Sequence, residues 1–176
     1  MGDVYQFNKV KLFCGFIYQE ADRYQKVKED LIRYFSRIDS ESKQFKFDIT
    51  SYYYKEMNHP LFRRFLSFNE LIAPDRLPEI KLITNELEIN NARAGKRTVN
   101  LDPGYLSSGS IIIATTKNYN HRVPLKDGIY AHMEYIIKKK EIIPLEWTYP
   151  DFRLVEYMNY FTSLRDLYKK NLNEKK

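Results

Sequence analysis

The sequence predicts an α+β fold, with one domain in which about three helices pack on a mostly antiparallel mixed sheet. The chain of 176 residues has the usual length of a single domain. Its first third alternates between strand-like and helix-like spacing of apolar residues, whereas residues 97–147 are strand-like and joined by short turns. Short connections favour antiparallel pairing, and strands that are segregated from helices are typical of α+β proteins.

The N-terminal segment predicts a β-α-β opening. Lys9–Tyr18 carries apolar residues on both faces of a strand, which is typical of a strand in the middle of a sheet. Glu20–Ile38 follows with an apolar stripe at helical spacing. Phe45–Ile49 then alternates apolar and polar residues, as a strand does, and leads into three consecutive tyrosines.

Residues 59–91 predict a helix or a loop, followed by a second helix. His59–Ile72 has apolar residues at helix-like spacing, although a loop pinned over the core fits the same pattern. Pro78 suits the first turn of a helix, which we expect to continue to about Asn91. Three apolar residues of this helix should face inward: Ile80, Ile83 and Leu87.

The C-terminal half predicts five strands and a last helix. The strands are expected at Arg97–Tyr105, Ser110–Lys117, His121–Leu125, Ile129–Ile137 and Glu141–Trp147. Lys126-Asp127-Gly128 predicts a turn and Lys138-Lys139-Lys140 a hairpin tip. Asp151 should cap the last helix. We expect the domain to span residues 1–168 and residues 169–176 to form a frayed basic tail.

Charge and composition restrict the class of protein only in part. The net charge of +6 suggests a nucleic-acid partner, but the last eight residues, with four lysines and one glutamate, supply +3 of it. The single cysteine, Cys14, lies in an apolar run and should be a buried, inert thiol. The sequence has neither an apolar run of about 18 residues nor a secretory signal, so we expect a cytoplasmic protein without a membrane partner.

The stretch from Asn100 to Asp151 is the best candidate for a functional site, because charged groups and histidines alternate there with strand residues. Asp102, in an Asp-Pro-Gly sequence, either belongs to a turn or ends a strand and points into a cleft. Lys117 and Arg122 would neutralise an anion, and His121 is the acid–base candidate together with Asp102. Two further residues are candidates for ligand binding, Tyr54 and Glu56.

A metal site is a weaker possibility. His132 and Glu134 lie two residues apart and should share one strand face, where they would bind a divalent metal or form a simple hydrogen bond. The spacing typical of zinc ligands is absent. For magnesium, the oxygen donors would be Asp102, Glu134 and Glu146.

Several common enzyme motifs are absent. Ala92–Thr98 looks superficially like a phosphate-binding loop, but Asn90 replaces its first glycine and Arg97 stands where Ser or Thr should bind magnesium. The chain also has no Gly-x-Gly-x-x-Gly, Gly-x-Ser-x-Gly or His-Glu-x-x-His sequence. The usual nucleotide-binding, serine-hydrolase and zinc-protease signatures are therefore excluded.

Several longer motifs resemble an uncharacterised prokaryotic family called domain of unknown function 4416. They include S-Y-Y-Y-K-E-M at 51–57, H-P-L-F-R-R-F at 59–65, V-N-L-D-P-G-Y-L at 99–106 and L-E-W-T-Y-P-D at 145–151. The resemblance spans nearly the whole chain and implies a single-domain member of that family. Because the family has no assigned activity, the resemblance implies no catalytic role for any residue.

Three functions are compatible with the sequence. The first is binding of a small anionic ligand, phosphorylated or a nucleotide, at the sheet end that carries Asp102, Lys117, His121 and Arg122, with magnesium held by Asp102 and Glu146. The second is RNA or DNA binding through Arg63-Arg64, Lys138–Lys140 and the tyrosine-rich segment. The third is a scaffold or oligomerisation module in which Tyr52–Tyr54 forms an interface.

Overall fold

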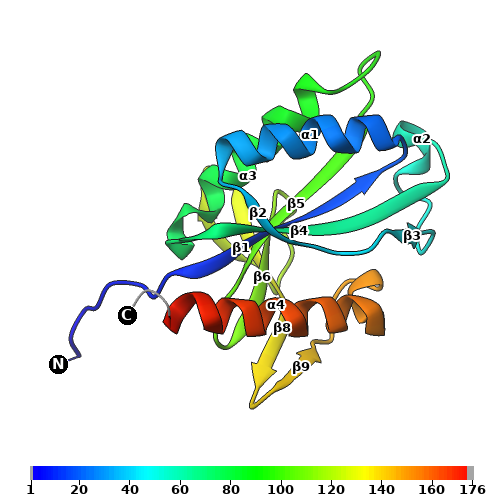
Figure 1. Cartoon of the computed structure of the whole chain (residues 1–176). Coiled ribbons are helices and arrows are strands. Elements are labelled where there is room, and N and C mark those ends of the chain that lie inside the picture. The colour runs from blue at the N-terminus through cyan, green and yellow to red at the C-terminus, as the bar shows by residue number, and fades with distance from the viewer. Residues whose placement is uncertain (1, 174–176) are drawn as a thin grey trace.

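The computed structural model describes residues 2–173, and these form one layered α+β domain (Figure 1). Its strands are β1 (Val10–Tyr18), β2 (Ile38–Glu41), β3 (Phe45–Phe47), β4 (Leu61–Ile72), β5 (Val99–Leu106), β6 (Ser110–Thr115), β7 (Val123–Lys126), β8 (Ile129–Lys138) and β9 (Glu141–Pro144). Its helices are α1 (Ala21–Tyr34), α2 (Tyr54–Met57), α3 (Leu77–Asn90) and α4 (Val155–Asn173). Short 3₁₀ helices precede α3 and α4, namely η1 (Pro74–Arg76) and η2 (Asp151–Arg153).

The described strands form one nine-stranded sheet with antiparallel pairing. The order is β2-β4-β1-β5-β6-β8-β7, with β3 added to β4 and β9 added to β8. The second expected strand corresponds to β3, and because β1 and β3 both pair antiparallel with β4, they run in the same direction with β4 between them. The expected β-α-β opening is therefore present in a split form. The predicted α+β class, antiparallel sheet and C-terminal helix are confirmed.

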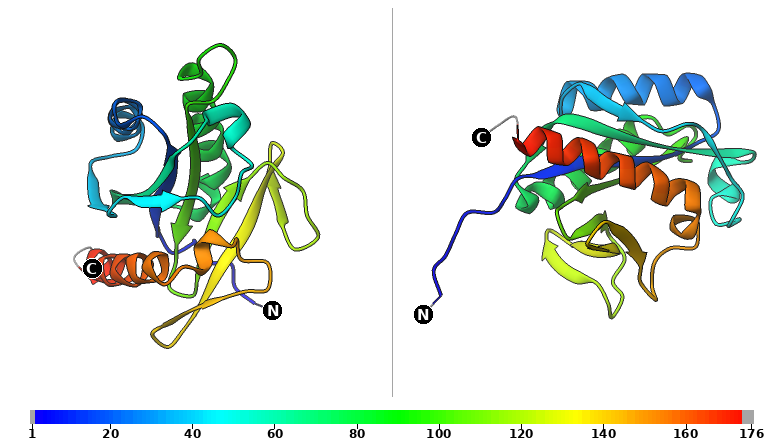
Figure 2. Two further views of the ribbon diagram at one scale, coloured as in Figure 1. Left: turned by 90° about the vertical axis from the view of Figure 1, so that its right-hand side faces the viewer. Right: turned by 60° about the horizontal axis from the view of Figure 1, so that its bottom comes forward.

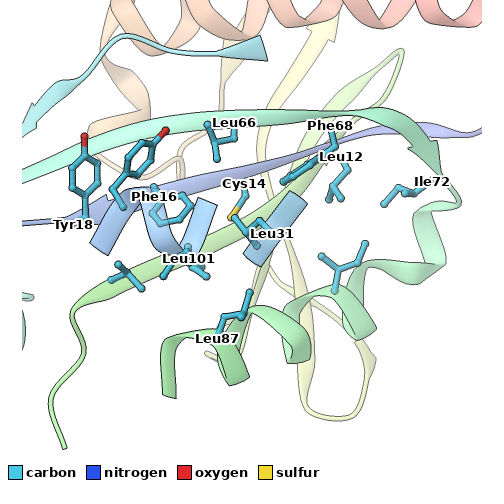
Figure 3. Packing of buried hydrophobic residues seen from close by; sticks show 14 of the residues in the cluster. Leu12, Cys14, Phe16, Tyr18, Leu31, Leu66, Phe68, Ile72, Leu87 and Leu101 are labelled. Carbon is cyan, nitrogen blue, oxygen red and sulfur yellow. The ribbon is translucent and has the colours of Figure 1, made fainter. Parts of the chain in front are cut away.

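Helices cover both faces of the central strands. On one face, Leu12, Cys14 and Phe16 of β1 pack with Leu31 of α1 and Leu87 of α3 (Figure 3). On the other face, neighbouring side chains of β1 and β4 pack with α4. Figure 2 shows α1 and α4 on opposite sides of the strands. As predicted, Cys14 is buried, and this burial raises the pKa of its thiol.

The segment His59–Ile72 is neither the expected helix nor the alternative loop. Residues 61–72 form β4, the longest strand, which lies between β1 on one side and β2 and β3 on the other. Both faces of β4 are covered, so apolar residues occur at odd and even positions and the alternation that marks a strand is lost. The second predicted helix is confirmed as α3, with Pro78 in its first turn and Ile80 and Leu87 buried.

Other boundaries shift by a few residues. The first helix ends at Tyr34, and Ile38, which was assigned to its apolar stripe, begins the edge strand β2. His121 and Arg122 precede β7 rather than belonging to it. Asp151 begins a 3₁₀ turn, and α4 continues through Asn173, so residues 169–173 of the expected tail are helical. The rest of that tail, residues 174–176, lies outside the described residues.

The Asp102-Pro103-Gly104 sequence is not a turn, because it lies within β5. Leu101 directs its backbone groups toward α3, where Lys81 Nζ donates to Leu101 O (2.7 Å) and Leu101 N donates to Glu88 Oε1 (2.7 Å). Pro103, two residues further on, has the same orientation, so its missing N–H removes no hydrogen bond to β1. Pro103 is therefore tolerated in β5, whereas a proline in a strand that is paired on both sides would remove a hydrogen bond.

The sheet opens between β5 and β6, and this opening positions the site. The two strands pair only over Gly104–Leu106 and Ile111–Ile113. Toward its N-terminal end, β5 pairs with β1 alone, and Lys81 and Glu88 of α3 form hydrogen bonds with the backbone groups on its other edge.

No helix among residues 2–173 is both long and apolar enough to span a membrane.

Candidate functional site

A cavity of about 850 Å³ lies where β5 and β6 diverge. Asp102 of β5 lines it, together with three residues that follow β6, namely Lys117, His121 and Arg122. The structure therefore brings together four of the predicted site residues. Its other walls come from α3, from residues 47–53 and from residues 147–151.

Arg63 of β4 forms the charged floor of this cavity. Its side chain is 2% exposed, and its Nη1 lies 2.8 Å from Asp102 Oδ2 while its Nη2 lies 3.2 Å from Asp151 Oδ2. The guanidinium crosses β1 at Gly15, where a Cβ would lie 3.6 Å from Arg63 Cζ. One buried cation thus holds two carboxylates. Burial raises the pKa of Asp151, although the neighbouring Arg63 opposes this shift.

His121 lies in a stack of aromatic rings on the cavity wall. Its ring centroid is 5.1 Å from that of Trp147 and 6.1 Å from that of Tyr119, with interplanar angles of 13° and 21°. Its Nε2 lies 3.2 Å from Nδ1 of His132. Partial burial is the largest cause that lowers the pKa of His121, and the neighbouring His132 and Arg122 lower it further. The imidazole is consequently neutral at neutral pH, which is the form that accepts a proton.

Arg122 supports the cavity wall rather than offering an unoccupied guanidinium fork. Its side chain is buried, and its Nη1 donates to Lys117 O (2.8 Å) while its Nη2 donates to Tyr149 Oη (2.8 Å). Its Nε donates to Nδ1 of His132 at 3.1 Å. These bonds join the segment that follows β6 to β8 and to the segment before α4. Arg122 therefore contributes a fixed positive charge, and no sequence pattern indicates this supporting role.

His132 and Glu134 lie behind the cavity wall, in the protein interior. Both side chains are 0% exposed, and His132 Nε2 lies 3.1 Å from Glu134 Oε1. Glu134 Oε2 accepts a hydrogen bond from the backbone N–H of Tyr149 at 3.0 Å. Burial lowers the pKa of His132 to about 4 and raises that of Glu134 to about 8. The expected shared strand face exists, but it faces the core.

This burial predicts a pH-dependent stability. The raised pKa of Glu134 means that the folded state binds a proton more tightly than the unfolded state, so its contribution is lost as pH rises through about 8. His132, whose pKa is about 4, has already lost its proton in this range. We expect the free energy of unfolding to fall by about 1–2 kcal/mol between pH 6.5 and pH 8.5. Urea unfolding of Glu134→Gln should show a flatter profile, and an equal decline in the variant would contradict this origin.

Comparison with known proteins agrees with the resemblance seen in the sequence. Residues 8–168 match the family described as "Domain of unknown function (DUF4416)". The chain belongs to this family. No curated protein and no solved structure matches the chain. Family membership therefore spans nearly the whole fold, whereas its chemistry has to be inferred from the cavity itself.

The remaining predicted residues do not line the cavity. Glu146 is exposed on the segment after β9. Glu56, a candidate for ligand binding, forms an ion pair with Arg97, with 2.7 Å between its Oε2 and Arg97 Nε. Tyr54 contacts the ring of His59, with 5.3 Å between the centroids.

These positions bear directly on the magnesium hypothesis. Of the three proposed oxygen donors, only Asp102 lines the cavity, since Glu134 is buried in the interior and Glu146 lies outside. Among the described residues, no group of three His, Cys, Asp or Glu side chains is placed to hold a metal ion. A magnesium ion at this cavity would therefore need oxygen ligands other than Glu134 and Glu146 in addition to Asp102.

Sequence reasoning missed several residues that shape the cavity. Arg63 was considered only as a nucleic-acid contact, although a charged residue inside the apolar segment 61–72 already indicates a buried ion pair. Asn100 and Arg97 also line the cavity, as do aromatic residues of two segments. No motif marks the asparagine, because its importance depends on the divergence of β5 and β6.

Proposed function

We propose that this protein binds a small phosphorylated ligand in the cavity between β5 and β6. The observation that carries the proposal is the presence of Asp102, Lys117 and His121 on one cavity of about 850 Å³. Small-molecule sites commonly have volumes of about 300–1,000 Å³ and combine apolar walls with a few polar groups. Five basic residues line this cavity against three acidic ones, which favours an anionic ligand.

Lys117 is the residue best placed to meet the anion. Its side chain is exposed, and its Nζ lies 4.4 Å from the centroid of the Tyr52 ring, which also lines the cavity. Among the described residues, the ammonium group makes this cation–π contact and no ion pair, so a phosphate would readily replace the contact. Arg122, by contrast, has its donors engaged and adds only its charge. His121, neutral and next to the same cavity, is the acid–base group if the ligand is also transformed.

Replacing Lys117 tests the proposal. Thermal-shift measurements would use inorganic phosphate, ribose 5-phosphate and AMP, each with and without Mg²⁺. A ligand present at 100 times its Kd adds about 2.7 kcal/mol to the free energy of unfolding. We expect Lys117→Ala to weaken binding about tenfold or more, as loss of a charge-assisted hydrogen bond does.

The matched control is Lys126→Ala. Lys126 is on β7, and its side chain is 78% exposed and outside the cavity lining. Its removal should leave the thermal shift unchanged. The proposal fails if no phosphorylated probe raises the melting temperature, or if Lys117→Ala and Lys126→Ala behave alike.

The alternative functions receive less support from the residues first chosen for them. Arg63 is buried in its ion pairs, and Arg64 donates to Tyr18 Oη, Glu41 and the carbonyl of Ser42. Neither arginine therefore presents an unengaged guanidinium to a nucleic-acid backbone. Tyr52 and Tyr53, considered for an oligomer interface, line the cavity. We consequently favour the small ligand over nucleic acid and over an oligomerisation module.

A further inference from the structure

The inner end of the cavity contains a hydrogen-bond donor without a partner. Asn100 of β5 is 5% exposed and lines the cavity. Its Oδ1 accepts a hydrogen bond from Arg97 Nη1 at 3.0 Å, which fixes the orientation of the amide because arginine can only donate. The nitrogen must then point the other way, and Nδ2 has no hydrogen-bond partner among the described residues.

Such an arrangement is costly unless something binds there. A buried polar group without a partner costs about 1–3 kcal/mol, and buried side-chain polar atoms are therefore normally paired. Asn100 lies opposite Ile17 of β1, in the part of β5 that has no pairing with β6. The unpaired donor thus borders the cavity opened by the divergence of the two strands. This observation is independent of the residues that support the proposed anion site.

Asp102 supplies a complementary acceptor beside this donor. Asn100 and Asp102 are two residues apart on one strand and share a face, so they lie about 6.6 Å apart along it. Asp102 is 22% exposed, and its Oδ2 contacts Arg63. The inner end of the cavity therefore presents an N–H donor and a carboxylate acceptor side by side.

The chemistry of this pair excludes a phosphate at the inner end and suits hydroxyl groups. A phosphate dianion offers acceptors alone, and it would be repelled by the carboxylate of Asp102. A hydroxyl group both donates and accepts, so neighbouring hydroxyls of one molecule can donate to Asp102 and accept from Asn100. Lys117, the exposed cation proposed to bind the anion, belongs to the separate segment that follows β6.

We propose that the ligand is a phosphorylated sugar, whose hydroxyl groups bind Asn100 and Asp102 and whose phosphate binds Lys117. This inference rests on the proposed function and names the class of ligand for the same cavity. The sugar phosphate can be free or part of a nucleotide, because both carry neighbouring hydroxyls and a phosphate. The aromatic rings of Tyr52, Tyr53 and Trp147 on the cavity walls suit the apolar face of a sugar and a nucleobase alike.

Calorimetric titration of the full chain with three probes tests the inference. Ribose 5-phosphate and AMP carry the hydroxyls, and inorganic phosphate does not. We expect at least one of the first two to bind about tenfold or more tightly than inorganic phosphate. The tighter of the two then identifies the source of the sugar. Equal or tighter binding of inorganic phosphate would overturn the inference while leaving the anion site at Lys117 intact.

Two variants of Asn100 isolate the donor. Asn100→Asp keeps the oxygen that accepts from Arg97 and removes the N–H donor, whereas Asn100→Leu removes both. The measured quantity is the ratio of the affinity for the sugar phosphate to the affinity for inorganic phosphate. The negative charge added by Asn100→Asp weakens the binding of both ligands, so its general effect cancels in this ratio. In both variants this ratio should fall toward one.

Asn159→Asp, on the exposed surface of α4, is the matched control and should keep the wild-type ratio. A wild-type ratio in both Asn100 variants would show that the donor does not contact the ligand and would overturn the inference. If none of the three probes binds the wild-type protein, the proposed function itself fails, which is a different result from loss of the ratio.

Discussion

Replacing Arg63 by methionine should lower the free energy of unfolding at pH 7 by about 3–5 kcal/mol. Its guanidinium is 2% exposed and contacts Asp102 at 2.8 Å and Asp151 at 3.2 Å. Phe65 and Phe152 pack around it, with 5.2 and 5.3 Å from Arg63 Cζ to their ring centroids. Methionine fills part of the space but leaves two partly buried carboxylates, Asp102 at 22% and Asp151 at 10% exposure, without their cation. The cost is the uncompensated charge, which is much larger than the value of a surface ion pair.

The neighbouring arginine provides a matched control. Arg64 lies on the opposite face of β4, and its side chain is 27% exposed where it pairs with Glu41. Arg64→Met should therefore cost about 1 kcal/mol. Urea unfolding of the two variants would measure the difference. Similar losses of stability in the two variants would mean that breaking the buried ion pairs of Arg63 costs no more than breaking the partly exposed ion pair of Arg64.

The pH dependence gives a second check on the role of Arg63. Burial raises the pKa of Asp151, and without the cation its protonation removes buried negative charge, so Arg63→Met should lose less stability at pH 4 than at pH 7. Adding Asp151→Asn to Arg63→Met should recover part of the loss at pH 7. A loss that is independent of pH and unaffected by Asp151→Asn would point to packing instead of charge.

The fold was largely predictable where the spacing of apolar residues or a flanking turn marks an element, and β1 was predicted although both of its faces are buried. The helix α3 and the strands β5, β6 and β8 were expected close to where they lie, because their spacing or their turns indicate them. The strand β4 was missed because both of its faces are covered and the spacing of its apolar residues also fits a helix. A strand of this kind cannot be distinguished from a helix by periodicity alone.

The site was predictable only in part, and the reason is physical. Lys117, His121 and Arg122 lie within six residues of one another, so their proximity follows from the sequence. Arg63 and Asp102 are 39 residues apart and meet because β4, β1 and β5 are neighbours in the sheet. The sequence likewise contains no sign that Asn100 loses a partner, since that depends on where β5 and β6 separate. Long-range pairing therefore decides which polar residues share the cavity.

Gly104→Ala should be the second strongly destabilising substitution, with a loss of about 3 kcal/mol. A Cβ at this position would lie 2.4 Å from Ile112 O and 2.7 Å from Phe13 Cζ. The first contact is with backbone, which cannot move aside as a flexible side chain can. Gly104 is also the last residue of β5 that pairs with β6 before the strands diverge. Relief of the contact must therefore push the two strands apart where the cavity begins.

Two other glycines separate this steric effect from a general effect of glycine replacement. A Cβ at Gly109 would have nothing within 4 Å, so Gly109→Ala should change stability little. Gly15 is intermediate, because its Cβ would lie 3.3 Å from Phe65 Cε1. Urea unfolding should rank the losses of stability in the order Gly104, Gly15, Gly109.

Widening the gap between β5 and β6 would also separate Asp102 from the segment of Lys117. Gly104→Ala should therefore weaken binding of ribose 5-phosphate. A folded Gly104→Ala variant with unchanged binding would show that the β5–β6 junction does not shape the cavity.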